Sequence, residues 1–216
     1  AVAGAAVVAM ALVVAVAGLL AVRSGRAATL LAPTWTVPSL PADALAQLDA
    51  DVQLAIADAQ ANVAAAPASA AAWRELGTVY DAHALWAPAE AAYRRAVQLA
   101  PGDAAGVYYL ACVLAVVRPA DRETERRYRQ VIALDPGYAP AWLRLADVYA
   151  STGRTADAIA AYRAAIAAYG PPERAALARR ALGQTLLNAG DVEGAIRELE
   201  AVARVRGDDR VTVANL

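Results

Sequence analysis

The stretch 70–101, AAAWRELGTVYDAHALWAPAEAAYRRAVQLAP, contains the pattern from which the fold of this chain follows. Its large and small apolar residues recur at intervals of three and four, which places them on one face of each of two helices. A proline closes the stretch, because it lacks the amide proton that a continuing helix requires. The positions that carry this pattern are Trp73, Leu76, Gly77, Tyr80, Ala89, Tyr93, Ala96 and Pro101.

The same spacing returns further along the chain in two recognisable copies. The better one consists of Trp142, Leu145, Ala146, Tyr149, Ala158, Tyr162 and Ala165, with Gly153 after its first helix and Pro171 after its second. The other consists of Leu182, Gly183, Leu186, Gly190, Ala195, Leu199 and Val202. In this last copy Arg179 takes the place of the tryptophan.

A further copy, between the first and the best match, is irregular. Its first helix fits the pattern through Val107, Leu110, Ala111 and Leu114. Its second helix fits through Tyr128, Val131 and Pro136 only after one inserted residue. We therefore predict a longer turn around residues 118–120, and four units at 70–103, 104–138, 139–172 and 176–209.

This pattern resembles the tetratricopeptide repeat, a helix-turn-helix unit of about 34 residues whose stacked copies usually bind other proteins. Gly77 with Ala89, and Ala146 with Ala158, would let the two helices of a unit approach closely. One unit cannot bury its apolar face alone, so stacked units share a continuous core and form a curved solenoid. The prediction is an all-α, tetratricopeptide-like solenoid of helical hairpins.

The first 22 residues, Ala1 to Val22, contain no charged side chain. A helix of that length spans about 33 Å, enough to cross a bilayer core of roughly 30 Å. We therefore predict one transmembrane helix over residues 1–22, in contact with the lipid bilayer. A secretory signal peptide and a buried solenoid helix are the alternatives.

The orientation of this span stays open on the sequence. Arg23 and Arg26 follow it directly, and the tendency of cytoplasmic flanks to be basic would place the repeats in the cytoplasm. The chain begins with Ala, so basic residues upstream would reverse the argument. Membrane-anchored repeat proteins that resemble this one carry an extracytoplasmic solenoid. Our expectation is a single-pass protein of a bacterial inner membrane with its repeats outside the cytoplasm, and a cytoplasmic repeat domain is the alternative.

Between the span and the repeats, the sequence predicts a spacer and a capping helix. Residues 23–41 carry Pro33, Pro38 and Pro41 and are expected to form an extended spacer. Residues 42–69 are expected to hold a helix that caps the stack as the second half of an incomplete unit. Its apolar stripe consists of Leu45, Leu48, Val52, Ile56 and Val63. Residues 210–216 are assigned to a tail.

The charge pattern argues against nucleic-acid binding. All 20 basic residues among the 216 are arginines, and 21 acidic residues balance them to a net charge of −1. The arginines of 122–129 alternate with acidic residues, which is typical of a solvated helix face. No isolated basic tract remains that would track a phosphate backbone.

Catalysis finds little support in the sequence. His83 and Cys112 are the only histidine and the only cysteine, so neither a zinc site nor a Cys/His pair has its ligands at a usable spacing. No glycine-rich phosphate loop and no haem-attachment motif is present. We expect no enzyme activity, no metal or cofactor, and no small-molecule substrate.

The resemblance implies that the first helices of the units line a concave, partner-binding face. By register, that face carries Arg74, Thr78, Asp81, Tyr108, Cys112, Leu143, Asp147, Arg180, Gln184 and Asn188. Family members that hold a C-terminal carboxylate use Lys and Asn side chains at such positions, and this set is missing here. A folded partner or an extended segment is therefore expected instead.

Two functions follow from these expectations. The chain is predicted to be a membrane-anchored interaction scaffold, an accessory subunit whose partners are the other protein subunits of a larger membrane complex. The alternative is an assembly factor or chaperone adaptor that binds clients transiently, as cytochrome c maturation factors with such repeats do. The stoichiometry of the isolated complex would distinguish the two.

Overall fold

The computed structural model describes residues 36–119 and 121–214. The expected transmembrane helix, residues 1–22, lies outside these residues. Within them, none of the helices combines the length and the apolar character that crossing a bilayer requires. The chain divides into two compact units, Ala1–Val37 and Pro38–Leu216, and all helices discussed below belong to the second.

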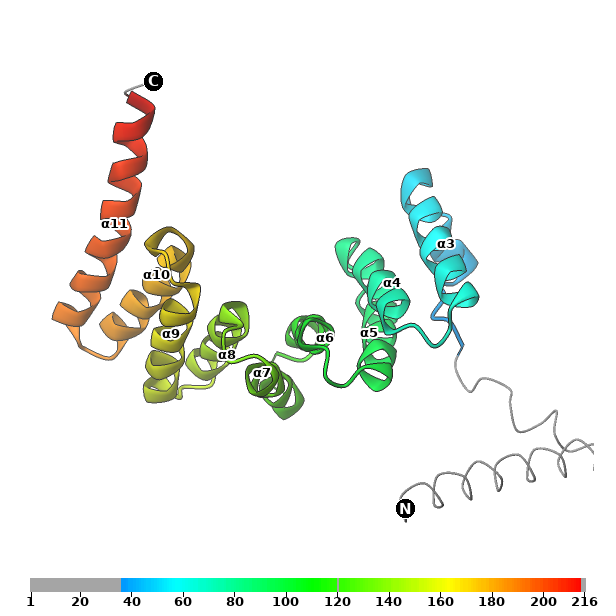
Figure 1. Ribbon diagram of the computed structural model, residues 1–216, viewed down its shortest axis with the longest axis horizontal. Coiled ribbons are helices and arrows are strands. Elements are labelled where there is room, and N and C mark those ends of the chain that lie inside the picture. Colours follow the sequence, from blue (N-terminus) through cyan, green and yellow to red (C-terminus); the bar gives the residue numbers. More distant parts are fainter. Residues whose placement is uncertain (1–35, 120, 215–216) are drawn as a thin grey trace, which may run out of the picture. The chain divides into compact units, whose positions relative to one another are not determined.

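The second compact unit, which begins at Pro38, consists of helical hairpins that follow one another along an arc (Figure 1). The first helices of the hairpins are α4 (Ala70–Ala82), α6 (Ala104–Val117), α8 (Ala139–Ser151) and α10 (Pro172–Asn188). The second helices are α5 (Trp86–Leu99), α7 (Arg122–Leu134), α9 (Thr155–Tyr169) and α11 (Val192–Ala214). The two helices of each hairpin pack on one another, and the second helix of a hairpin packs on the first helix of the following one, so the stack shares one core.

The ends of the helices follow from local sequence. Ser69 and Asp103 accept hydrogen bonds from the amides of Ala72 and Ala105, which caps α4 and α6. Gly153 and Gly190 close α8 and α10 in the left-handed region, with φ of 75° and 86°. Gly170 follows α9, and α10 then starts at Pro172, before the expected unit start at residue 176. Proline suits this first position because its missing amide proton has no helical partner there.

The irregular second unit has the longer turn that its sequence predicts. Residues 83–85 join α4 to α5 and residues 152–154 join α8 to α9, whereas residues 118–121 separate α6 from α7, one residue more.

The core is formed by the residues that carry the repeat pattern. Tyr80, Tyr93 and Leu110 are fully buried, and so are the small residues Ala89 and Ala158 at the helix crossings. The indole N–H of Trp73 donates to the carbonyl of Pro67 at 2.9 Å, and that of Trp142 donates to Pro136 at 3.0 Å. In both cases the tryptophan is thus hydrogen bonded to the proline that ends the preceding unit.

The N-terminal cap differs from the single helix expected after residue 42. A short helix α2 (Ala42–Leu45) is followed by a turn, and α3 (Ala50–Ala65) begins after Asp49. The turn is stabilised by the side-chain amide of Gln53, which donates to the carbonyl of Leu48 at 2.8 Å. α3 packs on α4 through Ile56, Ala59 and Val63, as a second helix of an incomplete unit would.

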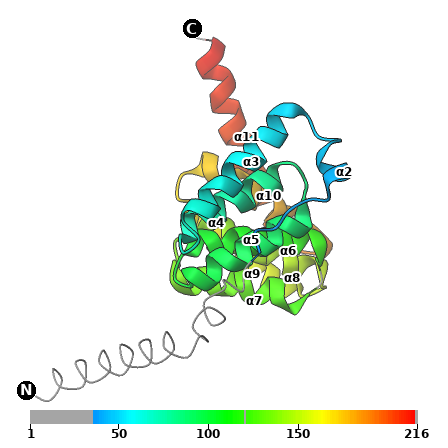
Figure 2. The same ribbon diagram turned by 90° about the vertical axis from the view of Figure 1, so that its right-hand side faces the viewer.

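The segment before α2 also packs on the stack. The carbonyl of Pro38 accepts hydrogen bonds from the hydroxyl of Tyr80 and from the side-chain amide of Gln60. In a view along the stack, this segment runs back from α2 across the end of the hairpins (Figure 2). Residues 38–41, which the sequence assigns to a spacer, thus lie against α3 and α4, where an incomplete unit would have its first helix.

Candidate protein-binding surface

The residues expected on the concave face all lie on first helices. α4 carries Arg74, Thr78 and Asp81; α6 carries Tyr108 and Cys112; α8 carries Leu143 and Asp147; α10 carries Arg180, Gln184 and Asn188. In Figure 1, α6 and α10 lie on the inner side of the arc relative to α7 and α9. Their accessibility differs, because Thr78, Arg180, Gln184 and Asn188 are exposed while Leu143 is only 5% exposed.

Tyrosines from several helices converge at the middle of this face. The ring of Tyr108 lies 5.0 Å from that of Tyr138 and 6.2 Å from that of Tyr128, centroid to centroid. Tyr109 is 5.9 Å from Tyr108 and stacks on Tyr93 at 5.7 Å with an angle of 13° between the planes. We call these five residues the tyrosine cluster. Tyr93 and Tyr128 are buried in the core, whereas Tyr108, Tyr109 and Tyr138 are accessible. The accessible rings offer rigid apolar surface together with hydroxyl groups, which is the combination that protein interfaces favour.

A recurrent hydrogen bond connects the second helix of a unit to this face. The hydroxyl of Tyr93 lies 3.3 Å from the Thr78 hydroxyl, and that of Tyr162 donates to the Asp147 carboxylate at 2.7 Å, in each case to the residue 15 positions earlier. In the second unit the hydroxyl of Tyr128 donates to the Cys112 sulfur at 3.7 Å, 16 positions earlier. The inserted residue accounts for the difference.

Cys112 therefore serves as one acceptor in a repeated series. Burial raises the pKa of the Cys112 thiol above its ordinary value, more than the hydrogen bonds from Tyr128 and Tyr108 lower it. The thiol is accordingly protonated at neutral pH and is a poor nucleophile. Burial likewise raises the pKa of Tyr108 and of Tyr128, so both hydroxyls remain available as hydrogen-bond donors.

Charged groups flank the tyrosine cluster. Arg144 of α8 is 53% exposed, lies 3.4 Å from the Asp147 carboxylate, and interacts with the hydroxyl of Tyr108. On the other side, burial raises the pKa of the Asp81 carboxyl in spite of its interaction with the hydroxyl of Tyr93. The middle of the face thus combines aromatic surface, one accessible guanidinium and two carboxylates.

Arg74 has a partner within the chain. Its guanidinium forms an ion pair with Asp103, the residue that caps α6, and so links the first unit to the second. The Arg74 side chain remains 34% exposed, so part of it faces solvent. Its expected part in partner binding stays a prediction.

Sequence register does not indicate several members of this surface. Tyr109 and Arg144 each follow a residue that register places on the face, but their own positions are not among those that the resemblance assigns to it. Tyr93 and Tyr128 are expected in the core, where they are indeed buried, with their hydroxyls reaching the face. Tyr138 precedes α8, and only the packing of that turn on Tyr108 reveals its place.

The fold and this surface define the class of the protein. The helical hairpins between residues 38 and 214 form a solenoid of tetratricopeptide type. Residues 122–181 match the sequence model of the tetratricopeptide repeat. No protein with a curated description matches the sequence.

Solved structures of low sequence identity share the fold. A crystal structure of MamA is 21% identical, with a TM-score of 0.68 over 80% of this chain and 99% of the MamA chain. MamA from Desulfovibrio magneticus RS-1 is 16% identical, with a TM-score of 0.66 over 74% and 88% of the two chains. YrrB, described as a tetratricopeptide repeat protein with an unusual peptide-binding site, is 17% identical, with a TM-score of 0.61 over 77% and 84%. These similarities concern the fold of the stacked hairpins.

The side chains of this surface are suited to contacts with a protein segment. In residues 36–119 and 121–214, no group of three or more His, Cys, Asp or Glu side chains could hold a metal ion. The fold is that of a protein-interaction module, and the side chains of the face are aromatic rings, amides and paired charges. They can bury a partner segment and hydrogen bond to it.

Proposed function

We propose that this chain is a membrane-anchored protein-interaction scaffold that holds a partner protein on its concave face. The tyrosine cluster carries the proposal. Its rings are fixed by contacts with one another, and two of them, Tyr93 and Tyr128, also by hydrogen bonds to the first helix of their unit, so the face loses little side-chain entropy when a partner binds. Interfaces draw much of their binding energy from such preorganised aromatic residues.

An extended segment of a partner suits this face better than a free carboxylate terminus does. The exposed side chains of α10, Gln184 and Asn188, hydrogen bond to one another at 3.1 Å and can exchange this bond for the main chain of a partner. Arg144 supplies a single accessible positive charge near the cluster. The Lys and Asn set that clamps a terminal carboxylate in other tetratricopeptide proteins is missing.

The cellular setting that we propose rests on the sequence. The uncharged run of residues 1–22 supports an anchor in a bacterial inner membrane, with the repeats outside the cytoplasm. An anchor of this kind, joined to a preorganised binding face, suits an accessory subunit of a membrane protein complex. The chain would cover a neighbouring subunit and hold it at a constant ratio.

Co-purification with the full chain tests this proposal. We expect gentle detergent extraction to recover a partner protein at fixed stoichiometry, and Tyr108→Ala to reduce its recovery about tenfold or more, as loss of a central aromatic anchor does. Arg144→Ala should weaken recovery less and leave the thermal midpoint unchanged, because its side chain is half exposed. Arg74→Ala is the corresponding test for the first unit.

Arg197→Ala, at an exposed position of α11 outside both the concave face and its tyrosine cluster, is the matched control and should recover the partner at wild-type level. Unchanged recovery with both Tyr108→Ala and Arg144→Ala, in folded protein, would exclude the concave face. A partner recovered at variable, substoichiometric amounts would argue for a transient assembly factor.

A further inference from the structure

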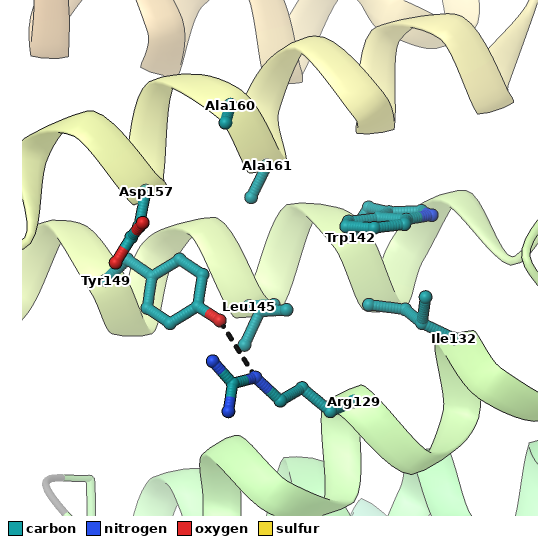
Figure 3. Close-up of a pocket in the computed structure, with 8 residues that line it drawn as sticks. All are labelled: Arg129, Ile132, Trp142, Leu145, Tyr149, Asp157, Ala160 and Ala161. Atoms are coloured by element: carbon teal, nitrogen blue, oxygen red, sulfur yellow. Dashed lines mark hydrogen bonds between the residues drawn. The ribbon is translucent and has the colours of Figure 1, made fainter.

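A second candidate binding site lies on the side of the stack that the second helices form. A pocket of about 240 Å³ opens between α7 and α9, with α8 as its floor. Figure 3 shows Leu145 and Trp142 of α8 at the base, Ile132 of α7 beside the indole, and Ala160 and Ala161 of α9 along the opposite wall. Its interior is therefore apolar.

Comparison with the other hairpins explains why this groove is open. In the fourth unit, Arg179 and Glu198 occupy the positions of Trp142 and Ala161, and their ion pair at 2.7 Å fills the equivalent space. Between α5 and α7, Arg94 reaches across to both oxygens of Glu123 at 2.9 and 2.7 Å. In the first unit, Trp73 and Ala92 occupy the positions of Trp142 and Ala161, and both are buried, with exposed fractions of 2% and 0%.

At the α7–α9 groove, an ion pair joins the two helices only at one end, where Arg154 at the N-terminus of α9 contacts Glu125 of α7. Trp142 is half-buried, whereas Trp73 at the corresponding position of the first unit is 2% exposed. Ala161, the counterpart of Ala92, is buried like it, and the neighbouring Ala160, which also lines the pocket, is exposed. The partly exposed indole of Trp142 therefore forms part of the open pocket.

The polar rim of the pocket is held in place. The Arg129 side chain donates from Nε to the hydroxyl of Tyr149 at 3.1 Å, the dashed line in Figure 3. The guanidinium of Arg154 lies 4.2 Å from the centre of the Tyr149 ring and pairs with Asp157 and Glu125. These contacts fix the rim and prevent its side chains from folding into the pocket.

The volume of the pocket and the charges on the neighbouring helices indicate which kind of side chain fits it. A dry apolar cavity of about 150 Å³ already accepts a benzene molecule, so this pocket can hold an aromatic side chain. The two helices that form the walls also carry exposed arginines: Arg122 and Arg126 on α7, and Arg163 on α9. Arg126 is 69% exposed although it lies 3.7 Å from Glu123. The carboxylates nearest the pocket, Glu125 and Asp157, are already paired with Arg129 and Arg154.

We propose that the α7–α9 pocket binds an aromatic side chain of a partner-protein segment that carries carboxylates beside this side chain. The ring rests on Leu145 and Trp142 against the alanine wall, and the acidic neighbours pair with Arg126 and Arg163. The site is independent of the concave face, so the chain can hold two segments, or two partners, at once.

A short peptide probe tests this site on the full chain. The probe is the acetylated pentapeptide Glu-Glu-Phe-Glu-Glu, and binding is followed through the indole N–H signal of Trp142 in amide-detected NMR. We expect saturable shifts of this signal. Replacing the phenylalanine of the probe by alanine, or its glutamates by lysines, should weaken binding at least roughly tenfold, since the apolar anchor or the charge complement is lost.

Ala160→Leu fills the pocket from an exposed helix position and should abolish binding of the probe. Its matched control is Ala91→Leu, the same substitution at the corresponding exposed position of the first unit, which should bind as wild type does. Arg126→Ala combined with Arg163→Ala should weaken binding and flatten its dependence on salt.

Three results would overturn the proposal: no shift of the Trp142 signal up to millimolar probe, equal binding of the lysine peptide, or binding that survives Ala160→Leu. The peptide experiment tests the pocket alone, because Tyr108→Ala, which alters the concave face, leaves the pocket intact.

Discussion

Ala84 occupies the turn after α4 with φ of 57°, a left-handed conformation that side chains with a Cβ rarely adopt. Gly153 and Gly190 take the same place in the third and fourth units. The same backbone hydrogen bond also closes all three turns. In chain order, the amides of Leu85, Arg154 and Asp191 donate to the carbonyls of Tyr80, Tyr149 and Leu186, respectively. The turn geometry is thus common to these units, and only the residue in the first differs.

We therefore expect Ala84→Gly to stabilise the protein. Glycine removes the Cβ strain of this conformation, worth about 1 kcal/mol, and part of that gain is offset by the greater freedom of glycine in the unfolded chain. A chemical denaturation midpoint measures the effect. The reverse change, Gly153→Ala, should lower stability by a similar amount, since open space surrounds that residue and only its backbone is strained. A loss of stability in Ala84→Gly would contradict this view of the turn.

Gly77 has a different reason to be small. A Cβ at this position would lie 2.6 Å from two ring atoms of Tyr93, which is fully buried and stacked on Tyr109. The ring has no space to move away, so Gly77→Leu should lower the free energy of unfolding by about 3 kcal/mol. Thermal unfolding followed by circular dichroism measures this. Gly102→Ala is the control, because a Cβ at that position would have no atom within 4 Å and the effect should be small.

Between elements, arginine–carboxylate pairs connect successive units. Arg74 with Asp103, Arg94 with Glu123, and Arg154 with Glu125 each join residues 29 positions apart. The helix faces that the sequence indicated as solvated in fact carry these connections. The charge alternation along 122–129, and the pairs it forms within α7, follow from the helical spacing of the sequence. The pairs of Glu123 with Arg94 and of Glu125 with Arg154 join different helices and could not be predicted from it.

Glu123 is the centre of the largest of these networks. It accepts hydrogen bonds from Arg94 at 2.9 and 2.7 Å and from Arg127 at 3.1 Å, and the bond from Arg94 is the main cause that lowers the pKa of its carboxyl to about 2. A carboxyl whose pKa is lower in the folded chain stabilises the fold at neutral pH. That contribution is lost as the pH falls from about 5 towards 2.

Glu123→Gln should therefore lower stability by about 1 kcal/mol at pH 7 and reduce its decline between pH 5 and pH 2. Urea denaturation at a series of pH values measures both effects. Glu75→Gln, at an exposed position of α4, is the matched control and should preserve the wild-type pH profile. If the pH profile of Glu123→Gln matched that of the wild type, the network would not contribute to the acid sensitivity.

On the scale of the whole stack, the two ends are closed differently. At the N-terminal end α3 and the segment containing Pro38 cover α4, and Gln60 and Tyr80 anchor that segment. At the other end, large apolar side chains remain partly exposed over α10 and α11. They are Leu177, Leu187, Val192, Ile196 and Leu199, with exposed fractions from 38% to 50%. Within the residues that the structure describes, no further element covers them.

This asymmetry predicts how the stack opens. A solenoid is stabilised by contacts between neighbouring units, so a hairpin with one neighbour opens more readily than one with two. Amide hydrogen exchange followed by mass spectrometry should give the slowest exchange in α6 and α8, and faster exchange in α11. Uniform protection along the stack would show instead that the unit 38–216 opens as a single cooperative block.

Much of the fold was predictable because its signals are local. The spacing of apolar residues identified both helices of each hairpin, and one insertion located the longer turn between α6 and α7. The break between α2 and α3 was not predicted, since it depends on a side chain, Gln53, that bonds to the backbone of the preceding turn. For the candidate site, register placed Tyr108 on a first helix but did not reveal its contacts with Tyr138 and Tyr128.

Local sequence is sufficient to specify which faces of the helices are apolar and where the helices end. It also implies that such hairpins must stack, because stacking is what buries their apolar faces. These properties follow from the helical period, from proline and glycine, and from the need to remove apolar surface from water. Which residues meet across helices depends instead on tertiary packing. The tyrosine cluster and the α7–α9 pocket are both formed by side chains from different helices. A local pattern specifies which face of one helix is apolar, but the distances between side chains of two helices are set only when the helices pack.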